Sequence, residues 1–264
     1  MTLDLAHLRA AISGCVFGRE IRSYTAISST QDYAISVAET NPCSHGTVIV
    51  SDSQLFGHGR RGRKWISPPG GLWFSVVTKQ DMKASSCIFL SYAMSLAVCE
   101  TISRNFHVEG YIKWPNDILL KTKKVAGILI SSAVQGMDLE YCVVGAGINL
   151  NSKPKGLTGS TSLIDHTKQS SIRLEPFLAS VLILFNHYYD EIMAGNWGLV
   201  TNRWKFRCPM MGKKVKVLLN GVQLDGLASD IDSNGSLILI TTGGGKVLIS
   251  DAQDVSIENQ IIKQ

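Results

Sequence analysis

The 264-residue sequence has no paired cysteines, no apolar run long enough to cross a bilayer and no recognisable secretory signal. Its six cysteines are scattered, without a Cys-x-x-Cys pair, which argues against a zinc site and against a disulfide framework. Isolated thiols are typical of a reducing compartment. We therefore expect a cytoplasmic protein with no membrane attachment.

Charged residues are also scarce, at 18% of the chain, whereas hydrophobic residues make up 45%. This balance is typical of a soluble globular protein. The net charge of +5 favours anionic substrates but does not require nucleic acid. There is no low-complexity segment and no internal repeat, and the length suits one large domain with a smaller appendage.

Glycine and arginine are concentrated in residues 57–65, which read G-H-G-R-R-G-R-K-W and which we call the glycine–arginine loop. Its glycines let the backbone approach a ligand closely, and its Lys and Arg side chains suit a phosphate or an acyl phosphate. Trp65 adds an aromatic face on which a flat base can stack. We expect this loop to be mobile until anionic ligands arrive and then to order over the site.

The composition of this loop also fits a dinucleotide-binding fingerprint, a nucleic-acid patch or a solvated charge run. Gly57, Gly59 and Gly62 formally match G-x-G-x-x-G, but that motif must open a helix. Here Pro68 and Pro69 follow within a few residues and prevent one. The nucleic-acid patch and the charge run both stay open on this segment alone.

Hydrophobic periodicity and turn residues predict the secondary structure of the first 211 residues. Strands are expected over residues 20–27, 47–50, 72–78, 111–114, 118–121, 125–131 and 141–148. Helices are expected over residues 31–39, 88–106, 176–193 and 196–206. The connections between the last four strands are too short for crossover helices, so the sheet should be mainly antiparallel.

Beyond about Met211 the pattern changes to short strands, expected over residues 215–219, 222–230, 237–241, 247–249 and 255–257. Asn220-Gly221 is a tight hairpin signal, and Asn234-Gly235 is a second turn. Short strands at this spacing predict a small antiparallel barrel. We therefore divide the chain into residues 1–211 and 212–264.

Three further motifs combine cations, amides and glycines: K-W-P-N-D at 113–117, K-V-A-G-I-L at 124–129 and G-A-G-I-N-L-N at 145–151. Taken singly, each equally fits an ordinary strand end, a solvated lysine or a bulge. Together with Ser28-Ser29-Thr30, Gln54 and the glycine–arginine loop, they form an ordered series. That series resembles the biotin protein ligase family, also called biotin–[acetyl-CoA-carboxylase] ligase.

The resemblance covers residues 20–151 strongly and the C-terminal strands loosely. It implies an α/β (α+β) fold in which helices flank a mixed, mainly antiparallel sheet of the biotin/lipoate ligase type, followed by a small SH3-like β-barrel. About twenty residues precede the first expected strand. The resemblance is therefore to the monofunctional type without an N-terminal winged helix, and we expect no specific DNA binding.

The resemblance also implies the reaction. A biotin carboxylate attacks the α-phosphate of ATP, with Mg²⁺ present, and gives biotinyl-5′-AMP and diphosphate. A lysine of a biotin carrier domain, such as that of acetyl-CoA carboxylase, then takes the biotinyl group and releases AMP. The family resemblance does not assign metal ligands in this sequence, and it leaves open a homodimer formed through a sheet edge.

Carried over to this sequence, the resemblance assigns residues to each ligand. The implied biotin site consists of Ser29, Thr30, Gln31, Gln54, Gly57, His58, Gly59, Arg60, Lys124 and Gly127. The implied ATP site consists of Arg60, Arg63, Trp65, Lys113, Asn116, Lys124 and Asn149. Lys124, Arg60 and Arg63 would bring the carboxylate and the phosphate together, because two anions meet only beside fixed positive charge. Asp117 would orient or deprotonate the acceptor lysine.

Two departures from the family pattern bear on these assignments. His58 stands where many relatives carry arginine, and residues 249–255 lack a glycine usual at the end of the barrel, which puts any contact between the barrel and ATP in question. A lipoate or octanoate ligase shares the fold and a strand-borne lysine, although the arginines and Trp65 favour biotin. A non-catalytic nucleic-acid-binding module is the alternative from another class.

Overall fold

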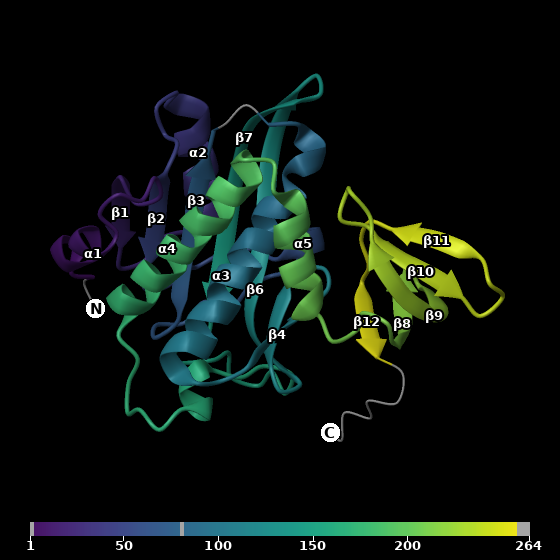
Figure 1. The fold of residues 1–264 in the computed structure, drawn as a ribbon. Coiled ribbons are helices and arrows are strands. Elements are labelled where there is room, and N and C mark those ends of the chain that lie inside the picture. The colour runs from purple at the N-terminus through teal and green to yellow at the C-terminus, as the bar shows by residue number, and fades with distance from the viewer. Residues whose placement is uncertain (1–2, 80–81, 258–264) are drawn as a thin grey trace.

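The computed structural model describes residues 3–79 and 82–257, and these residues build two sheets (Figure 1). The larger sheet has seven strands in the order β1-β2-β3-β7-β6-β5-β4. Its strands are β1 (Glu20–Tyr24), β2 (Thr47–Ser51), β3 (Leu72–Thr78), β4 (Gly110–Lys113), β5 (Asp117–Leu120), β6 (Lys123–Gln135) and β7 (Asp138–Ile148). Only β1 and β2 pair in parallel within this sheet, so the predicted mainly antiparallel sheet is confirmed.

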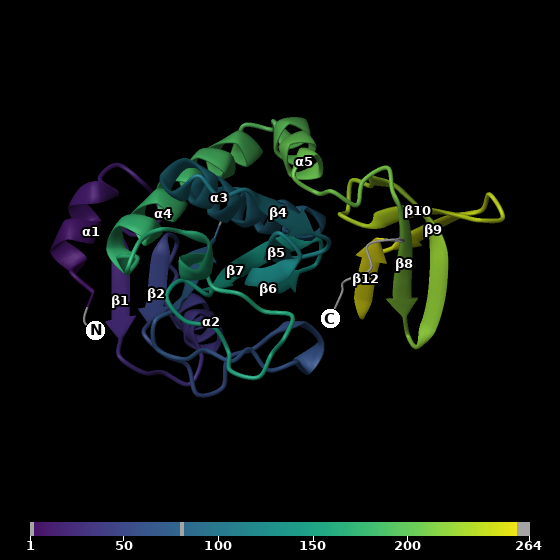
Figure 2. The ribbon, with the colours of Figure 1, turned by 90° about the horizontal axis from the view of Figure 1, so that it is seen from below.

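Helices cover both faces of this sheet (Figures 1 and 2). The helices are α1 (Leu5–Ala11), α2 (Thr30–Thr40), α3 (Ile88–Phe106), α4 (Leu174–Met193) and α5 (Trp197–Phe206), with short 3₁₀ turns η1 (Arg60–Gly62), η2 (Ala84–Ser86) and η3 (Leu163–His166). α3 packs on the sheet and α4 packs on α3, whereas α2 lies on the opposite face against β2, β3 and β7. The hydrophobic core therefore lies on both sides of the sheet.

The start of α2 positions part of the site, and the sequence explains where this helix begins and ends. Ser29 is the N-cap, and its hydroxyl accepts a hydrogen bond from the Asp32 backbone N–H (3.3 Å). The helix ends at Thr40 because Pro42 follows the C-cap Asn41. Ala34 and Val37 of this helix are buried in the core against the sheet. Packing therefore fixes the N-terminal end of α2 above β3.

α3 is a long apolar helix that is buried in the core. One stretch, Ala84–Phe106, meets the length and composition of a membrane span, and 78% of its most apolar window is buried inside the protein. The sequence was expected to contain no apolar run long enough to cross a bilayer. That expectation was wrong, because Ala84–Phe106 is long and apolar enough, although most of it is buried inside the protein. The helix is apolar all round because the sheet covers one of its sides while α4 and α5 cover others.

The smaller sheet has five antiparallel strands in the order β11-β10-β9-β8-β12. Its strands are β8 (Lys214–Leu219), β9 (Val222–Ile231), β10 (Leu237–Thr241), β11 (Lys246–Ile249) and β12 (Asp254–Ile257). Asn220 and Gly221 take φ of 49° and 81° between β8 and β9, as a two-residue hairpin requires. All the strands predicted for this region are present, in line with the expected SH3-like C-terminal part.

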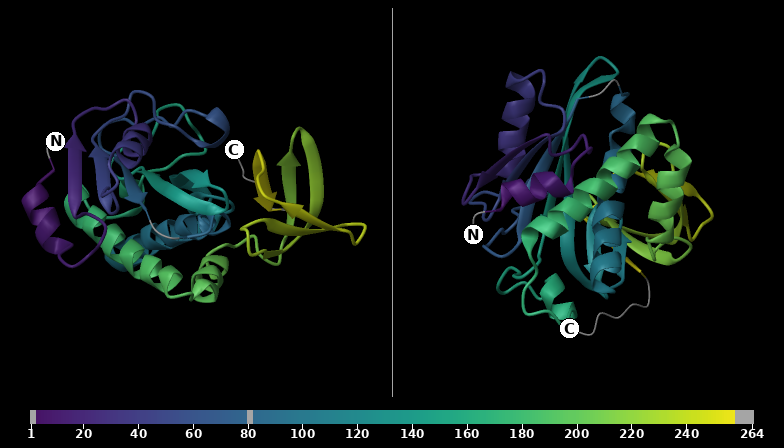
Figure 3. Two further views of the ribbon diagram at one scale, coloured as in Figure 1. Left: turned by 90° about the horizontal axis from the view of Figure 1, so that it is seen from above. Right: turned by 60° about the vertical axis from the view of Figure 1, so that its left-hand side comes forward.

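The two sheets meet beside the α5 and β4 side of the larger sheet (Figure 3). The Trp114 indole N–H donates to the Gly235 carbonyl (3.2 Å) in the turn between β9 and β10. Lys205 of α5 forms an ion pair with Asp230 of β9 (2.9 Å). These contacts place the segment between β11 and β12 opposite the glycine–arginine loop.

Candidate active site

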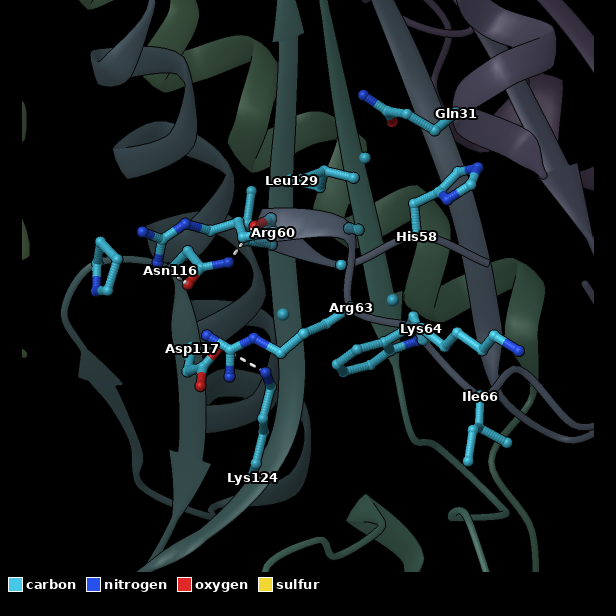
Figure 4. A pocket seen from close by; sticks show the side chains of 18 of the residues that line it. Gln31, His58, Arg60, Arg63, Lys64, Ile66, Asn116, Asp117, Lys124 and Leu129 are labelled. Atoms are coloured by element: carbon cyan, nitrogen blue, oxygen red, sulfur yellow. Dashed lines mark hydrogen bonds and ion pairs between the residues drawn. The ribbon is translucent and has the colours of Figure 1, made fainter. Parts of the chain in front are cut away.

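A pocket of about 270 Å³ lies between the larger sheet, the glycine–arginine loop and the C-terminal sheet (Figure 4). Every residue predicted for the site lines this pocket except Gly57. Those that do are Ser29, Thr30, Gln31, Gln54, His58, Gly59, Arg60, Arg63, Trp65, Lys113, Asn116, Asp117, Lys124, Gly127 and Asn149. The fold thus brings together residues that are up to 120 positions apart in the sequence.

One end of the pocket is a chain of hydrogen-bonded polar side chains. The Thr30 backbone N–H and hydroxyl both donate to Gln54 Oε1 (2.8 and 3.0 Å), and Gln54 Nε2 donates to Ser67 Oγ (2.7 Å). The Thr30 and Ser75 hydroxyls are 3.0 Å apart. Because these groups hold one another, they present oriented donors and acceptors to a polar ligand. Ser75 was not among the residues predicted for the site, because a hydroxyl residue within an apolar strand gives no local signal of a ligand contact.

Gln31 extends this polar end across the sheet. Its Nε2 donates to Ser131 Oγ (3.0 Å) and to the Val143 carbonyl (3.1 Å), and its Oε1 accepts from Ser75 Oγ (3.0 Å). Gly145 makes room for it, since a Cβ there would be 2.3 Å from Gln31 Oε1. The position of the Gln31 side chain therefore depends on the absence of a side chain at Gly145 of β7.

Trp65 lies across a pair of glycines that face each other in the sheet. Gly127 of β6 is directly opposite Gly147 of β7. A Cβ on Gly147 would be 2.4 Å from Trp65 Nε1, and one on Gly127 would be 3.2 Å from the same ring. The family resemblance places Gly127 in the biotin site, and in the structure the Trp65 indole lies against this glycine. This contact fixes the aromatic face of the pocket.

Lys124 and Asp117 form an ion pair on adjacent strands in the wall of the pocket. Lys124 Nζ lies 2.6 Å from Asp117 Oδ1 and 4.9 Å from the centre of the Trp65 ring. The side chains are 32% and 24% exposed, so the ammonium group is reachable from the pocket without being fully solvated. The carboxylate and the indole hold the ammonium group between them. Figure 4 shows both side chains beside Arg63.

The glycine–arginine loop is folded as a small hairpin. The Gly59 N–H donates to the Arg63 carbonyl (2.7 Å), and the Trp65 N–H donates to the Gly57 carbonyl (2.8 Å). Arg60 Nη1 donates to Asn116 Oδ1 (3.0 Å), which ties the hairpin to the K-W-P-N-D corner. Burial lowers the pKa of the Arg60 guanidinium, and the neighbouring Arg61 and Arg63 charges lower it further against the opposing effect of Asp117.

His58 points away from the arginines of the loop. Its Nε2 lies 2.8 Å from Asp32 Oδ2 at the first turn of α2, and the two side chains are 44% and 53% exposed. The residue thus joins the loop to α2 through a solvated pair.

The C-terminal sheet supplies one wall of the pocket, which the sequence analysis left in question. Residues 252–255 line the pocket directly. Arg63 Nη2 donates to the Gln253 carbonyl (3.1 Å), and Lys113 Nζ lies 2.8 Å from Asp254 Oδ1. No local sequence signal reveals these contacts, because they join residues more than 140 positions apart.

Asn149 is held rigidly and keeps one free acceptor. Its side chain is 1% exposed, and its Nδ2 donates to the Thr161 carbonyl (3.0 Å). Its Oδ1 is buried and has no hydrogen-bond partner among the described residues. A buried acceptor without a partner costs free energy, which a ligand N–H group can recover. Asn149 therefore fits the predicted contact with a purine.

A protein-held metal centre is not evident in the part of the chain that the structure describes, since no three His, Cys, Asp or Glu side chains cluster there. The carboxylates at the pocket are already paired with cations: Asp117 with Lys124, and Asp254 with Lys113.

Comparisons with known proteins agree with this geometry. Residues 24–149 match the model of the Biotin/lipoate A/B protein ligase family. The chain is 29% identical to the biotin–[acetyl-CoA-carboxylase] ligase of Mycobacterium tuberculosis, over 96% of this chain and 95% of that one. It is 28% identical to the bifunctional ligase/repressor BirA of Bacillus subtilis, over 94% and 78%. Its fold is similar to that of the biotin protein ligase from Aquifex aeolicus in complex with biotin and ATP, with a TM-score of 0.74, 25% identity and coverage of 90% and 99%.

Proposed function

We propose that the chain is a member of the biotin/lipoate A/B protein ligase family that forms biotinyl-5′-AMP from biotin and ATP and transfers the biotinyl group to a lysine of a biotin carrier domain. One observation carries the proposal. A single pocket joins a polar hydrogen-bonded end, a cluster of two guanidinium groups with one ammonium group, and an indole face. These groups suit a ureido ring, two anions and a purine base respectively.

The polar end of the pocket favours biotin over lipoate. Thr30, Gln54 and Ser75 are hydrogen bonded to one another, and a ureido ring can replace or join those bonds with its own N–H and C=O groups. The dithiolane ring of lipoate has no such groups. It would make none of the hydrogen bonds that this end of the pocket offers, and a site built for hydrogen bonding discriminates against a ligand of that kind.

The cationic cluster lies where the two anions must meet. In the first step a carboxylate oxygen of biotin forms a bond to the α-phosphorus of ATP while the bond to diphosphate breaks. Lys124, Arg60 and Arg63 stabilise the negative charge that gathers on the phosphoryl oxygens, because they are already oriented by Asp117, Asn116 and the Gln253 carbonyl. When Mg²⁺ is bound to the triphosphate it screens the same charge.

In the second step the acceptor lysine attacks the acyl carbon of the mixed anhydride and AMP leaves. The attacking amine must lose a proton, and Asp117 is the carboxylate at the pocket that can take it. Asp117 is paired with Lys124, so its first task is to orient that ammonium group. It becomes available to the acceptor amine when Lys124 turns to the α-phosphate.

The thiols are compatible with a cytoplasmic reaction, since all six cysteines are free in the structure. We propose that location because a reducing compartment preserves unpaired thiols.

Exchange of diphosphate into ATP tests the proposed first step. The purified chain is incubated with ATP, Mg²⁺, labelled diphosphate and either biotin or lipoate. We expect exchange with biotin, and exchange at least about a hundredfold slower with lipoate, as for a site that loses its matched hydrogen bonds. A preference for lipoate would instead assign the chain to lipoate or octanoate ligation. Label transfer from biotin to an isolated carrier domain then tests the second step.

A further inference from the structure

One short segment of the C-terminal sheet binds most of the positive charge of the glycine–arginine loop. This segment, residues 250–253, connects β11 to β12. Asp251 forms ion pairs with both Arg60 and Arg61. Arg63 Nη2 donates to the Gln253 carbonyl (3.1 Å) two residues further on. The contacts join residues 190 positions apart, so they are made only when both sheets are in place.

The segment that provides these partners is itself held in place. The Gln253 side chain accepts a hydrogen bond from the Gly221 backbone N–H (2.9 Å) in the hairpin between β8 and β9. The Gln253 N–H donates to the Leu218 carbonyl (2.8 Å). Ala252 is buried at 3% exposure. Asp251 therefore stands on a fixed support, and a charge pair made to a fixed partner loses less side-chain entropy.

The loop side of the contact is the tip of the hairpin. Arg61 takes φ of 55°, a left-handed conformation that is unfavourable for a side chain of this size. The side chains of Arg60, Arg61 and Asp251 are 22%, 30% and 36% exposed, so solvent screens their pairing only in part. One carboxylate shared by two guanidinium groups offsets the strain at the tip.

Arg60 and Arg61 differ in what else they can reach. Arg60 lines the pocket of 270 Å³ and also binds Asn116, whereas Arg61 does not line that pocket. A phosphate in the pocket can therefore compete with Asp251 for Arg60 but not for Arg61. The pair between Arg61 and Asp251 can persist while the site is filled.

We propose that Asp251 is a positioning residue that latches the glycine–arginine loop to the C-terminal sheet. The latch acts through Arg61 and Arg60, and it closes one wall of the pocket. The sequence predicted a loop that orders on ligand binding, and the shared carboxylate adds a contact within the protein that holds the same loop. In its consequence for catalysis the inference rests on the proposed function: a latched loop retains biotinyl-AMP until the carrier lysine arrives.

Hydrogen exchange of the full-length chain tests the latch without reference to any activity. The probes are the amides of Gly59 and Trp65, which donate the hydrogen bonds of the hairpin. Asp251→Asn and Arg61→Gln should each exchange these amides about fivefold faster, the factor typical of a partly exposed charge pair. Asp251→Glu should restore much of the protection, because it keeps the charge.

The matched control is Asp225→Asn, which removes a carboxylate from β9 that accepts only from Gln223 in the same strand among its described hydrogen bonds. This variant should leave exchange in the loop unchanged. In Asp251→Asn combined with Arg61→Gln, exchange should be little faster than in either single variant, since both remove the same pair. Loop exchange equal to wild type in Asp251→Asn, or fully additive effects in the double variant, would overturn the proposal.

The consequence for the intermediate is measured separately. Preformed biotinyl-AMP should dissociate about fivefold faster from Asp251→Asn than from wild type, while diphosphate exchange stays within a factor of a few. If Asp251→Asn exchanges its loop amides faster but releases biotinyl-AMP at the wild-type rate, the latch exists but does not retain the intermediate. If the chain shows no biotin-dependent exchange of diphosphate into ATP, the proposed function is refuted. The latch can still be tested, because amide hydrogen exchange is measured without any substrate.

Discussion

At the scale of single residues, three cations of the pocket are paired with carboxylates of the protein itself. Lys124 faces Asp117 at 2.6 Å, Lys113 faces Asp254 at 2.8 Å, and Arg60 binds Asp251. Charges gathered in one cavity repel one another, and these carboxylates remove most of that cost. The side chains are thereby held in oriented positions, so a ligand phosphate replaces existing partners instead of ordering free side chains.

The clearest test at this scale is Lys124→Ala. It removes the one ammonium group held between Asp117 and Trp65, and it leaves Asp117 without its partner. We expect biotin-dependent diphosphate exchange to fall on the order of a hundredfold or more, as for loss of one well-placed electrostatic donor. Lys123→Ala is the matched control, because Lys123 is the exposed neighbour and does not line the pocket. A folded Lys124→Ala protein with near-normal exchange would contradict this role.

At the scale of elements, the pairing register of β6 and β7 shapes the aromatic wall. Gly127 and Gly147 are opposite each other, and the absence of two side chains leaves a flat surface for the Trp65 ring. A shift of one residue in this register would place Ala146 or Ile148 beneath the ring and would close the pocket. The two glycines therefore matter because they lack side chains on this surface of the sheet, and not because they make the backbone flexible.

Gly147→Ala tests this arrangement. The new methyl group would lie 2.4 Å from Trp65 Nε1, so the indole must move. We expect roughly tenfold weaker ATP binding, in the range typical of one overpacked methyl group, with the fold retained. The control is Gly159→Ala, where a Cβ has no neighbour within 4 Å. Equal ATP affinity of Gly147→Ala and Gly159→Ala in calorimetric titrations would show that the ring does not take part in binding ATP.

The short turn η3 supports Asn149 and carries the most strongly shifted carboxyl group of this region. Ser162 and Asp165 form a capping box, and the Thr161 carbonyl beside it accepts from Asn149. A hydrogen bond from Lys153 lowers the pKa of Asp165 to about 2, and the Ser162 hydrogen bonds contribute in the same direction against partial burial. The ionised form of Asp165 therefore stabilises the folded state.

This shift predicts a pH dependence for Asp165→Asn. The depressed folded-state pKa means that the stabilisation is fully present above the unfolded-state pKa of about 3.9 and is lost as the pH falls towards about 2. Wild type should exceed the variant in urea midpoint by a constant amount between pH 7 and about pH 5, and by progressively less below about pH 4. The difference should be small, because the carboxylate is 39% exposed. An undiminished difference at pH 3 would assign the effect to packing instead.

At the scale of the whole molecule, the net charge is +5, but the basic glycine–arginine loop is not free in solution. The arginines of the glycine–arginine loop bind the C-terminal segment, and the loop faces a pocket rather than a flat surface. This arrangement disfavours the nucleic-acid-binding alternative, whose phosphate contacts need an accessible stripe of cations.

We predict correspondingly weak association with DNA. Binding should be independent of sequence and should disappear by about 0.2 M salt, because purely electrostatic contacts release counterions and weaken steeply as salt rises. Fluorescence anisotropy with unrelated duplexes across a salt series measures both properties. Sequence-selective binding that survives at that salt concentration would refute this expectation.

The sequence by itself determined the elements and the chemical groups of the site. Helical spacing predicted Ile88–Phe106 to the residue, and Asn220-Gly221 predicted the hairpin of the C-terminal sheet, because both signals are local. Charged and glycine-rich motifs likewise identified Lys124 and the glycine–arginine loop, because phosphate chemistry restricts which side chains can serve. These features depend on neighbours within a few residues of one another.

Only the tertiary structure decided which of those groups act together. The sequence indicated no contact partner for Ser75 in β3, for Gly147 beneath Trp65 or for Asp251 on two arginines. Their roles come from contacts across strands or between the two sheets, up to 190 residues apart in the case of Asp251. Local spacing cannot encode such contacts, since they are fixed by sheet register and by the packing of the C-terminal sheet against the larger one.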